Sequence, residues 1–252
     1  MSNKEAYRDE VFVLKVKDWQ TADKYAVGFS KNHGKVSFIS YGARYGKANG
    51  GRLVQPFAEL DATLVSGRRF DTLQQCELLS APRPMDLPTL AYGAVIAEAV
   101  ENLTEENSQQ EEIYTLLKQA FSLLRTHNKR LVTVAALCKL LCLSGFAPQL
   151  ISCTSCHSEV HEDAYFSTVQ GGVVCDCCIS GAELPFAEGA RELMLKLVTL
   201  DFEQPEKFVV RGADLMQLEQ TLYRFLLFQT DKPLRSLQFL AQIDLGTGVD
   251  KG

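Results

Sequence analysis

The sequence contains no apolar run approaching the roughly 18 residues that a membrane-spanning helix requires. The first ten residues, Met1 to Glu10, also lack the apolar core and small-residue cleavage site of a secretory signal peptide. We therefore expect a cytoplasmic protein. Because disulfides are rare in that reducing compartment, the eight cysteines are expected to bind metal or to pack in the core.

Recognisable catalytic motifs are also missing. The chain has neither the G-x-S-x-G pattern of serine hydrolases nor the H-E-x-x-H pattern of zinc proteases. The glycine-rich segment 42–52 differs from a Walker A loop, because Gly42 is too close to Gly46-Lys47 and Ala48 replaces the Ser or Thr that would hold Mg²⁺. The sequence therefore predicts a protein that is not an enzyme, with a site of paired carboxylates as the alternative left open.

Charge is distributed unevenly along the chain. Residues 1–80 contain 12 Lys and Arg against 9 Asp and Glu, whereas residues 81–252 contain 14 against 22. No acidic residue lies between Asp23 and Glu59, a stretch that holds six basic ones: Lys24, Lys31, Lys35, Arg44, Lys47 and Arg52. A stretch of one sign attracts polyanions locally. The alternative is a solvated face that lies opposite acidic residues from elsewhere in the fold.

The first 80 residues have the pattern of a small β-barrel. Five runs rich in β-forming residues cover residues 11–16, 24–29, 35–41, 57–65 and 72–79. Turn-forming segments separate them, and closure of five short strands into a barrel would remove the exposed edges. We expect a five-stranded OB-fold (oligonucleotide-binding) barrel over residues 1–81, with an SH3-like barrel as the second choice.

Three prolines near residue 82 end the strand pattern, and the apolar period then changes to that of helices. We expect helices over residues 89–103, 111–125, 129–144, 186–200, 213–229 and 233–243. Gly145 is expected to end the third helix as its C′ residue. The predicted fold class is α+β with two domains, the barrel followed by an all-α domain over residues 82–252.

A cysteine-rich insert interrupts the helical domain at residues 150–181. Its cysteines have the spacing C-x2-C-x18-C-x2-C and are Cys153, Cys156, Cys175 and Cys178. Each two-residue gap lets both thiolates face one ion, and the intervening residues are expected to form a hairpin that turns at Gly171-Gly172. Four thiolates favour tetrahedral zinc and leave no open position, which is typical of a structural zinc-ribbon-like site.

The other cysteines and the nearby histidines have simpler interpretations. Cys177 is an alternative ligand, but its pairing with Cys175 would leave one residue between ligands, which is a tight bite for zinc. His157 and His161 are expected on the surface of the insert. The remaining cysteines, Cys76, Cys138 and Cys142, are expected in the core.

Together these features resemble the RecO family of bacterial DNA-repair and recombination-mediator proteins. Five segments carry the resemblance, in the expected order along nearly the whole chain. They are Ala6 to Leu14, Tyr41-Gly-Ala-Arg44, Leu53-Val-Gln-Pro-Phe57, the Cys153 to Cys178 insert after Gly145-Phe-Ala-Pro148, and Lys232-Pro-Leu-Arg-Ser-Leu237.

The resemblance implies an N-terminal OB-fold barrel, a helical domain with a zinc insert, and a non-enzymatic role. It implies binding of single- and double-stranded DNA, annealing of complementary strands, and loading of RecA, with the partner RecR, onto DNA coated by single-strand-binding protein. The expected phosphate contacts are Lys15, Lys31, Lys35, Arg44, Lys47 and Arg52. The expected stacking residues are Tyr41 and Tyr45. Phe38 is a further candidate, but its mid-strand position favours packing in the core.

The resemblance also implies that the helical domain binds the acidic, apolar-ended tail of single-strand-binding protein. Four cations that flank apolar helix positions could receive such a tail: Arg125, Lys129, Arg130 and Lys139. A protein-protein adaptor without direct DNA binding is the alternative function. Salt bridges to the helical domain that cover the basic stretch between Lys31 and Arg52 would favour the adaptor function. Exposure of that stretch along a groove would favour DNA binding.

Overall fold

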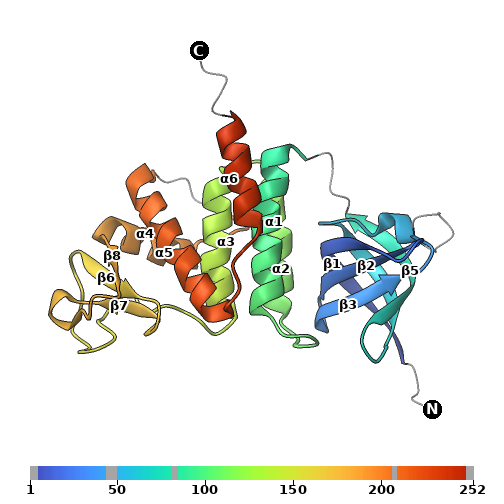
Figure 1. Ribbon diagram of the computed structural model, residues 1–252, viewed down its shortest axis with the longest axis horizontal. Helices are drawn as coiled ribbons and strands as arrows, with labels where there is room; N and C mark the ends of the chain where they lie inside the picture. The colour runs from blue at the N-terminus through green and yellow to red at the C-terminus, as the bar shows by residue number, and fades with distance from the viewer. Residues whose placement is uncertain (1–4, 44–49, 81–84, 206–208, 248–252) are drawn as a thin grey trace. The chain divides into compact units, whose positions relative to one another are not determined.

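The computed structural model describes residues 5–43, 50–80, 85–205 and 209–247. The chain forms two compact units, residues 1–118 and residues 119–252. The first unit holds the barrel, the first helix and most of the second (Figure 1). The domain boundary expected near residue 82 marks the change from strands to helices in the sequence and stays a prediction.

The N-terminal unit begins with a closed barrel in which β1 is followed in space by β2, β3, β5 and β4. The strands are β1 (Ala6–Trp19), β2 (Asp23–Ser30), β3 (Gly34–Ser40), β4 (Glu59–Val65) and β5 (Asp71–Ser80). All pairs are antiparallel except the short parallel pair between β3 and β5. The five predicted strands and the OB-like closed barrel are therefore confirmed.

β1 is longer than the predicted run because two neighbouring strands pair with different parts of it. Its first half pairs with β4 and most of its length from Val11 onward pairs with β2, with an irregularity in register between Val13 and Lys15. Such an irregularity bends a strand and helps a small barrel to close. Inside the barrel, Val11, Val13 and Phe38 belong to one core of buried apolar side chains.

α1 (Leu87–Leu103) follows the barrel, and Asp86 caps its N-terminus by accepting a hydrogen bond from the Thr89 N–H. The connection from α1 to α2 (Glu111–Leu123) lies against the β2–β3 turn. There the Asn107 N–H donates to the Lys35 carbonyl over 2.9 Å. Gly34 has φ +69°, and a Cβ at this position would lie 1.8 Å from the Ser108 carbonyl oxygen. Only glycine allows this close approach.

The second unit contains the last residues of α2, four further helices and a small sheet. The helices are α3 (Lys129–Leu143), α4 (Glu188–Thr199), α5 (Gly212–Thr230) and α6 (Ser236–Thr247). Asn128 caps α3 at its start, and Gly145, with φ +84°, follows its end as predicted. Every predicted helix is present, with ends that differ from the predicted ones by at most four residues.

The cysteine-rich insert forms a three-stranded sheet in the order β7-β6-β8. The strands are β6 (Ala164–Ser167), β7 (Gly172–Val174) and β8 (Leu184–Phe186). The expected hairpin is β6–β7, but its turn comes earlier than predicted, because Gly172 is already paired with Ser167. Phe186 belongs to β8 instead of starting α4. Phe166 fixes this sheet to α5, with its ring 5.3 Å from that of Phe225.

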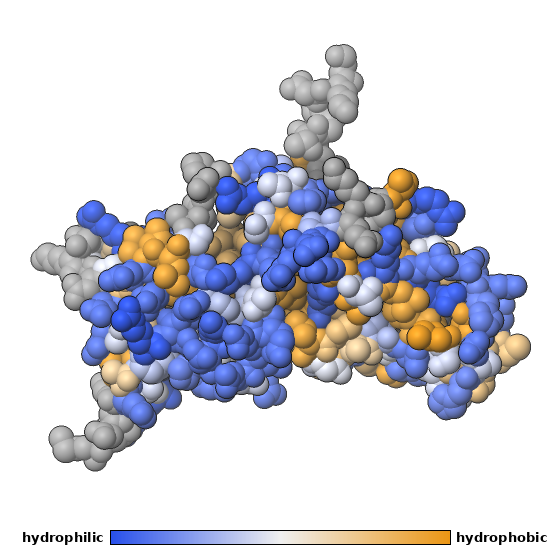
Figure 2. Space-filling view, turned by 180° about the vertical axis from the view of Figure 1, so that it is seen from behind, coloured by the Kyte–Doolittle hydropathy of each residue, from blue (hydrophilic) through white to orange (hydrophobic). Residues whose placement is uncertain are grey.

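The surface is mixed in polarity. On the face shown in Figure 2, hydrophilic side chains predominate and apolar ones are exposed in separate patches. None of the helices within the described ranges combines the length and the apolar character that a membrane span requires.

Candidate metal centre and nucleic-acid interface

Four cysteines of the insert meet at one point. The sulfurs of Cys153, Cys156, Cys175 and Cys178 all lie within 4.8 Å of one another. The Cys156 and Cys175 sulfurs are 3.7 Å apart. A tetrahedral zinc ion with Zn–S bonds of about 2.3 Å would place its sulfurs about 3.8 Å apart. The cluster therefore has the size and donor set of a site for a thiolate-bound metal ion, with the ligands that the spacing predicted.

Backbone contacts bring the two cysteine pairs together. The segment before Cys153 runs beside β7, where the Val173 N–H donates to the Gln149 carbonyl over 2.8 Å and the Thr154 N–H donates to the Val173 carbonyl over 2.9 Å. Each pair of cysteines lies on a tight turn of the backbone. In the second pair, the Cys178 N–H donates to the Cys175 carbonyl and closes the turn. The hairpin therefore fixes the distance between the two pairs.

The electrostatics of the thiols favour a cation. Burial opposes ionisation of Cys153, but hydrogen bonds from the backbone N–H groups of Cys156, Cys175 and Ser155 outweigh it and lower the pKa of Cys153 to about 6. The neighbouring sulfurs of Cys175 and Cys156 raise the pKa of Cys178 to about 12. A positive charge among the four thiols would therefore favour their ionisation together.

The remaining cysteines and the two histidines of the insert lie where the sequence indicated, except that Cys142 is only partly buried and not in the core. Cys177 is exposed and does not belong to the cluster, and His157 and His161 are also exposed. Cys138 is buried in α3, where burial raises its pKa above that of a free thiol. Cys76 is buried in the barrel.

Two of the predicted phosphate contacts hold α1 to the barrel. The Lys15 ammonium lies 2.9 Å from both carboxylate oxygens of Glu101. The Lys35 ammonium donates to the backbone carbonyls of Glu101, over 2.8 Å, and Thr104. These carbonyls belong to the C-terminal end of α1, so Lys35 binds the negative end of the helix dipole. Lys15 and Lys35 therefore have a structural role within the N-terminal unit.

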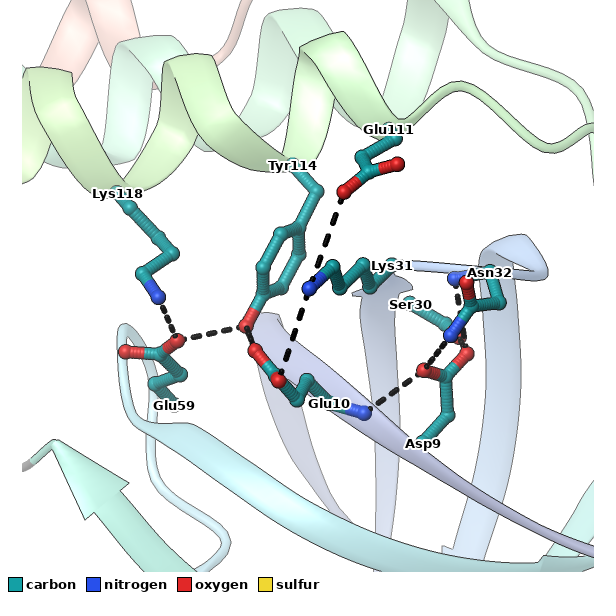
Figure 3. A network of polar contacts seen from close by, with 9 residues as sticks. All are labelled: Asp9, Glu10, Ser30, Lys31, Asn32, Glu59, Glu111, Tyr114 and Lys118. Carbon is teal, nitrogen blue, oxygen red and sulfur yellow. Dashed lines mark hydrogen bonds and ion pairs between the residues drawn. The ribbon is translucent and has the colours of Figure 1, made fainter.

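Lys31 belongs to a network of charges between the barrel and α2 (Figure 3). Its ammonium lies 3.8 Å from carboxylate oxygens of both Glu10 and Glu111. Figure 3 shows the Tyr114 hydroxyl reaching Glu59 over 2.6 Å and Glu10 over 3.0 Å. Lys118 completes the network with an ammonium 2.6 Å from Glu59.

The other predicted barrel residues lie apart from this network. Tyr41 is 55% exposed at the end of β3 and suits a stacking role, whereas Phe38 is fully buried, which confirms the core packing expected from its mid-strand position. Arg52 is exposed in the turn after Gly51. Three predicted residues, Arg44, Tyr45 and Lys47, lie outside the described residues.

The comparison with known proteins identifies the family. The model of the recombination protein O N-terminal domain matches residues 1–82, and that of the C-terminal domain matches residues 84–238. The chain belongs to the RecO family. Its relatives include proteins named "DNA repair protein RecO". The one from Symbiobacterium thermophilum is 31% identical over 93% of this chain and 96% of its own, and the one from Desulforamulus reducens is 27% identical over 97% and 98%.

Membership of the RecO family gives the chain a role in DNA repair and recombination. Two of the four predicted tail-binding cations of this RecO family member already have partners in the second unit. Arg130 forms a two-pronged ion pair with Glu219, and the Lys139 ammonium donates to the Val198 carbonyl over 2.9 Å. Burial lowers the pKa of Lys139, whereas Arg125 is exposed.

Sequence reasoning missed the partners of the barrel lysines. Glu101 is 86 residues from Lys15, and Tyr114 is 104 residues from Glu10. The sign of the charge pattern was the available signal, since the chain after the basic stretch is acidic overall and includes Glu101 and Glu111. The separation of more than 50 residues hid which lysine meets which carboxylate.

Proposed function

We propose that this protein binds single- and double-stranded DNA, anneals complementary strands, and acts with RecR to load RecA onto DNA coated by single-strand-binding protein. The observation that carries the proposal is a closed five-stranded barrel with OB-like strand order in a chain of the RecO family. Barrels of this kind present a face and two loops to oligonucleotides. Such a protein works at the chromosome, in the cytoplasm.

Annealing needs no fuel and no catalytic group. A basic surface neutralises phosphates on two strands and releases their counterions, which lowers the repulsion between the strands. Complementary bases then pair with their own free energy. The proposed activity therefore consists of binding only, and we propose that the protein is not an enzyme.

The structure narrows which barrel cations are available for phosphates. Lys15 and Lys35 already bind Glu101 and the end of α1, so we assign them to the fold. Arg52 is exposed. We propose that Arg52, with Arg44 and Lys47, contacts phosphate, and that Tyr41 and Tyr45 stack on bases. Lys31 is shared between Glu10 and Glu111 at 3.8 Å and can exchange a carboxylate for a phosphate.

We propose zinc as the metal of the cysteine cluster, as one ion per chain. Four thiolates with a sulfur-to-sulfur distance of 3.7 Å suit its tetrahedral coordination. All four positions are then filled by protein, so the ion stabilises the insert and does not activate water. Its loading also resolves the repulsion among the four thiolates.

One observation favours a second function, that of an adaptor that reaches DNA only through a partner. Lys15, Lys31 and Lys35 all contact carboxylates or carbonyls between Glu101 and Glu111, which reduces the positive potential of the barrel. The partners in that case are RecR and the tail of single-strand-binding protein. The tail would bind near Arg125 and Lys129, and unchanged tail affinity of a chain carrying Lys129→Glu and Arg130→Glu would remove this location.

Fluorescence anisotropy of labelled oligonucleotides at several salt concentrations separates the two functions. If about five cations engage phosphates, the logarithm of the binding constant should fall against the logarithm of salt with a slope of about −3 to −4 for single strands. The triple variant Arg44→Glu, Lys47→Glu, Arg52→Glu should lose this binding, and the control Arg224→Glu on α5 should keep it. Absence of binding by the unmodified chain at low salt would leave the adaptor function.

A further inference from the structure

Three aromatic side chains form a cluster on the outer side of the barrel, and none of them belongs to the residues assigned above. We call Trp19, Tyr25 and Phe70 the aromatic patch. The ring centroid of Phe70 lies 5.1 Å from that of Tyr25 and 5.9 Å from that of Trp19, and both ring pairs meet edge-on. All three side chains are partly exposed. The patch is therefore preorganised and presents aromatic surface to solvent.

The strand register shows why the patch faces outward. Lys17 lies directly opposite Tyr25, and the preceding pair is Val16 opposite Ala26. Ala26 is in the barrel core and Val16 packs against it. Because side chains alternate along a strand, Lys17 and Tyr25 point to the outside.

α1 occupies only part of this outer face. Lys15 and Lys35, which bind the end of α1, point to the same side as Tyr25 but lie farther along the strands. Trp19 is the last residue of β1, next to the β1–β2 connection, and Phe70 lies in the β4–β5 connection. In five-stranded OB barrels the outer face of strands 2 and 3 and these two connections are the places where oligonucleotides bind.

Three basic residues adjoin the aromatic patch. The two carboxylates next to it already accept hydrogen bonds within the barrel, Asp23 from the Gly42 N–H and Asp71 from the Tyr7 hydroxyl. Lys17, Arg68 and Arg69 are exposed, and none of the described carboxylates forms an ion pair with them. The Arg69 guanidinium carbon lies 5.0 Å from the centroid of Phe70. The acidic neighbour on the same strand is Asp18, which is exposed and points to the other side of β1. The arrangement combines stacking surface with phosphate-binding cations.

We propose that the aromatic patch stacks on unpaired bases of single-stranded DNA while Lys17, Arg68 and Arg69 bind the phosphates. This inference rests on the proposed DNA binding and narrows it, because only a strand whose bases are not already paired and stacked can offer base faces to the patch. Duplex DNA would then be bound through cations alone, and the patch would distinguish the two kinds of DNA.

The single tryptophan of the chain provides the direct test, because it is Trp19 itself. Emission excited at the tryptophan band is recorded during titration with an unlabelled oligothymidine, with a duplex, and with an abasic strand of the same length. Stacking on the patch predicts quenching by the oligothymidine and little change with the duplex or the abasic strand. Binding of the oligothymidine without any change in Trp19 emission would overturn the inference.

Variants give an independent measurement by anisotropy. Phe70→Ala should weaken binding of the oligothymidine at least about fivefold, given the usual contribution of one aromatic to base stacking, and should leave duplex binding unchanged. Arg68→Glu with Arg69→Glu should weaken both. The matched controls Phe228→Ala and Arg224→Glu replace exposed residues of α5 and should change neither.

The outcomes separate this inference from the proposed function. A chain that binds no DNA at low salt overturns both. A chain that binds single strands equally well with and without Phe70, or whose Trp19 emission responds equally to duplex and abasic strands, keeps the proposed function and overturns the stacking patch. Should Phe70→Ala fail to fold, the titration of the unmodified chain still decides.

Discussion

Replacing Asp9 by asparagine should cost the barrel about 2–3 kcal/mol of unfolding free energy. The Asp9 side chain in β1 is 1% exposed and accepts hydrogen bonds at both carboxylate oxygens. One oxygen accepts from the Glu10 N–H and the Asn32 side-chain amide, over 2.9 and 2.7 Å. The other accepts from the Ser30 hydroxyl, the Asn32 N–H and the His33 ring. Asp9 thus fixes the β2–β3 turn to β1.

The size of this loss in stability follows from the hydrogen bonds that an amide cannot accept. The NH₂ group of asparagine donates and does not accept. At one oxygen it would lose the hydrogen bonds from the Glu10 N–H and the Asn32 amide. At the other it would lose the bond from the Asn32 N–H, and the Ser30 hydroxyl and His33 ring would have to accept instead of donate. Each such bond contributes about 1.5 kcal/mol at the low end, and relief of the cost of burying a charge offsets part of the sum. The expected loss is therefore smaller than two full bonds.

The pH dependence gives a second signature of the same group. Burial by itself would raise the pKa of Asp9, but the hydrogen bonds from Ser30, His33 and Asn32 outweigh it and hold the pKa below its usual value. Because the folded pKa is the lower one, Asp9 stabilises the fold fully above its unfolded pKa of about 3.9 and loses this contribution as the pH falls through the folded value. The difference between the unmodified chain and Asp9→Asn should therefore shrink below about pH 4.

Urea denaturation followed by Trp19 emission measures both effects, since the only tryptophan lies in the barrel. The matched control is Asp61→Asn on β4, which removes a surface ion pair with Arg8 and should cost less than about 1 kcal/mol. If Asp9→Asn and Asp61→Asn cost the same at pH 7, or if the cost of Asp9→Asn does not depend on pH, the assignment of Asp9 as the anchor of the turn is wrong.

Three further changes test other parts of the fold. Gly34→Ala should destabilise the barrel by more than Gly145→Ala, because both have positive φ but only Gly34 has a carbonyl 1.8 Å from the new Cβ; equal losses in urea denaturation would contradict this. Tyr114→Phe should cost about 1.5 kcal/mol in the same assay, because its hydroxyl donates to buried Glu59, and an unchanged midpoint would argue against the network. Metal analysis should find one zinc ion per chain. The variant Cys177→Ser should retain this ion and Cys175→Ser should lose it; retention by both variants would contradict the assigned ligands.

Local patterns in the sequence predicted those parts of the structure that depend on neighbours along the chain. Runs of β-forming residues located the five strands, helical periodicity located the helices, and Gly145 marked the end of α3, because each of these depends on backbone geometry over a few residues. The two-residue gaps between cysteines are equally local. The prediction failed at β8, where a three-residue strand forms only because β6 offers it a pairing edge.

The parts that could not be predicted depend on contacts between distant residues. Nothing near Lys15 or Lys35 in the sequence shows that the end of α1 will lie beside them, and nothing near Trp19 shows that Phe70 will pack against it. The acid-free stretch between Asp23 and Glu59 suggested a surface of one sign. In the folded unit, Glu101 and Glu111 are brought back to this stretch, so a one-signed sequence becomes a surface of mixed sign.

This pairing changes what the salt dependence of DNA binding would mean. A lysine that leaves a carboxylate for a phosphate displaces a counterion from the DNA but exposes a carboxylate that attracts one. Such a lysine therefore adds less to the slope of the logarithm of affinity against that of salt. Exposed cations without such partners would add fully, as we expect for Lys17, Arg68 and Arg69. A slope well below the value for about five contacts, together with tight single-strand binding, would therefore indicate that stacking on the aromatic patch supplies the remaining affinity.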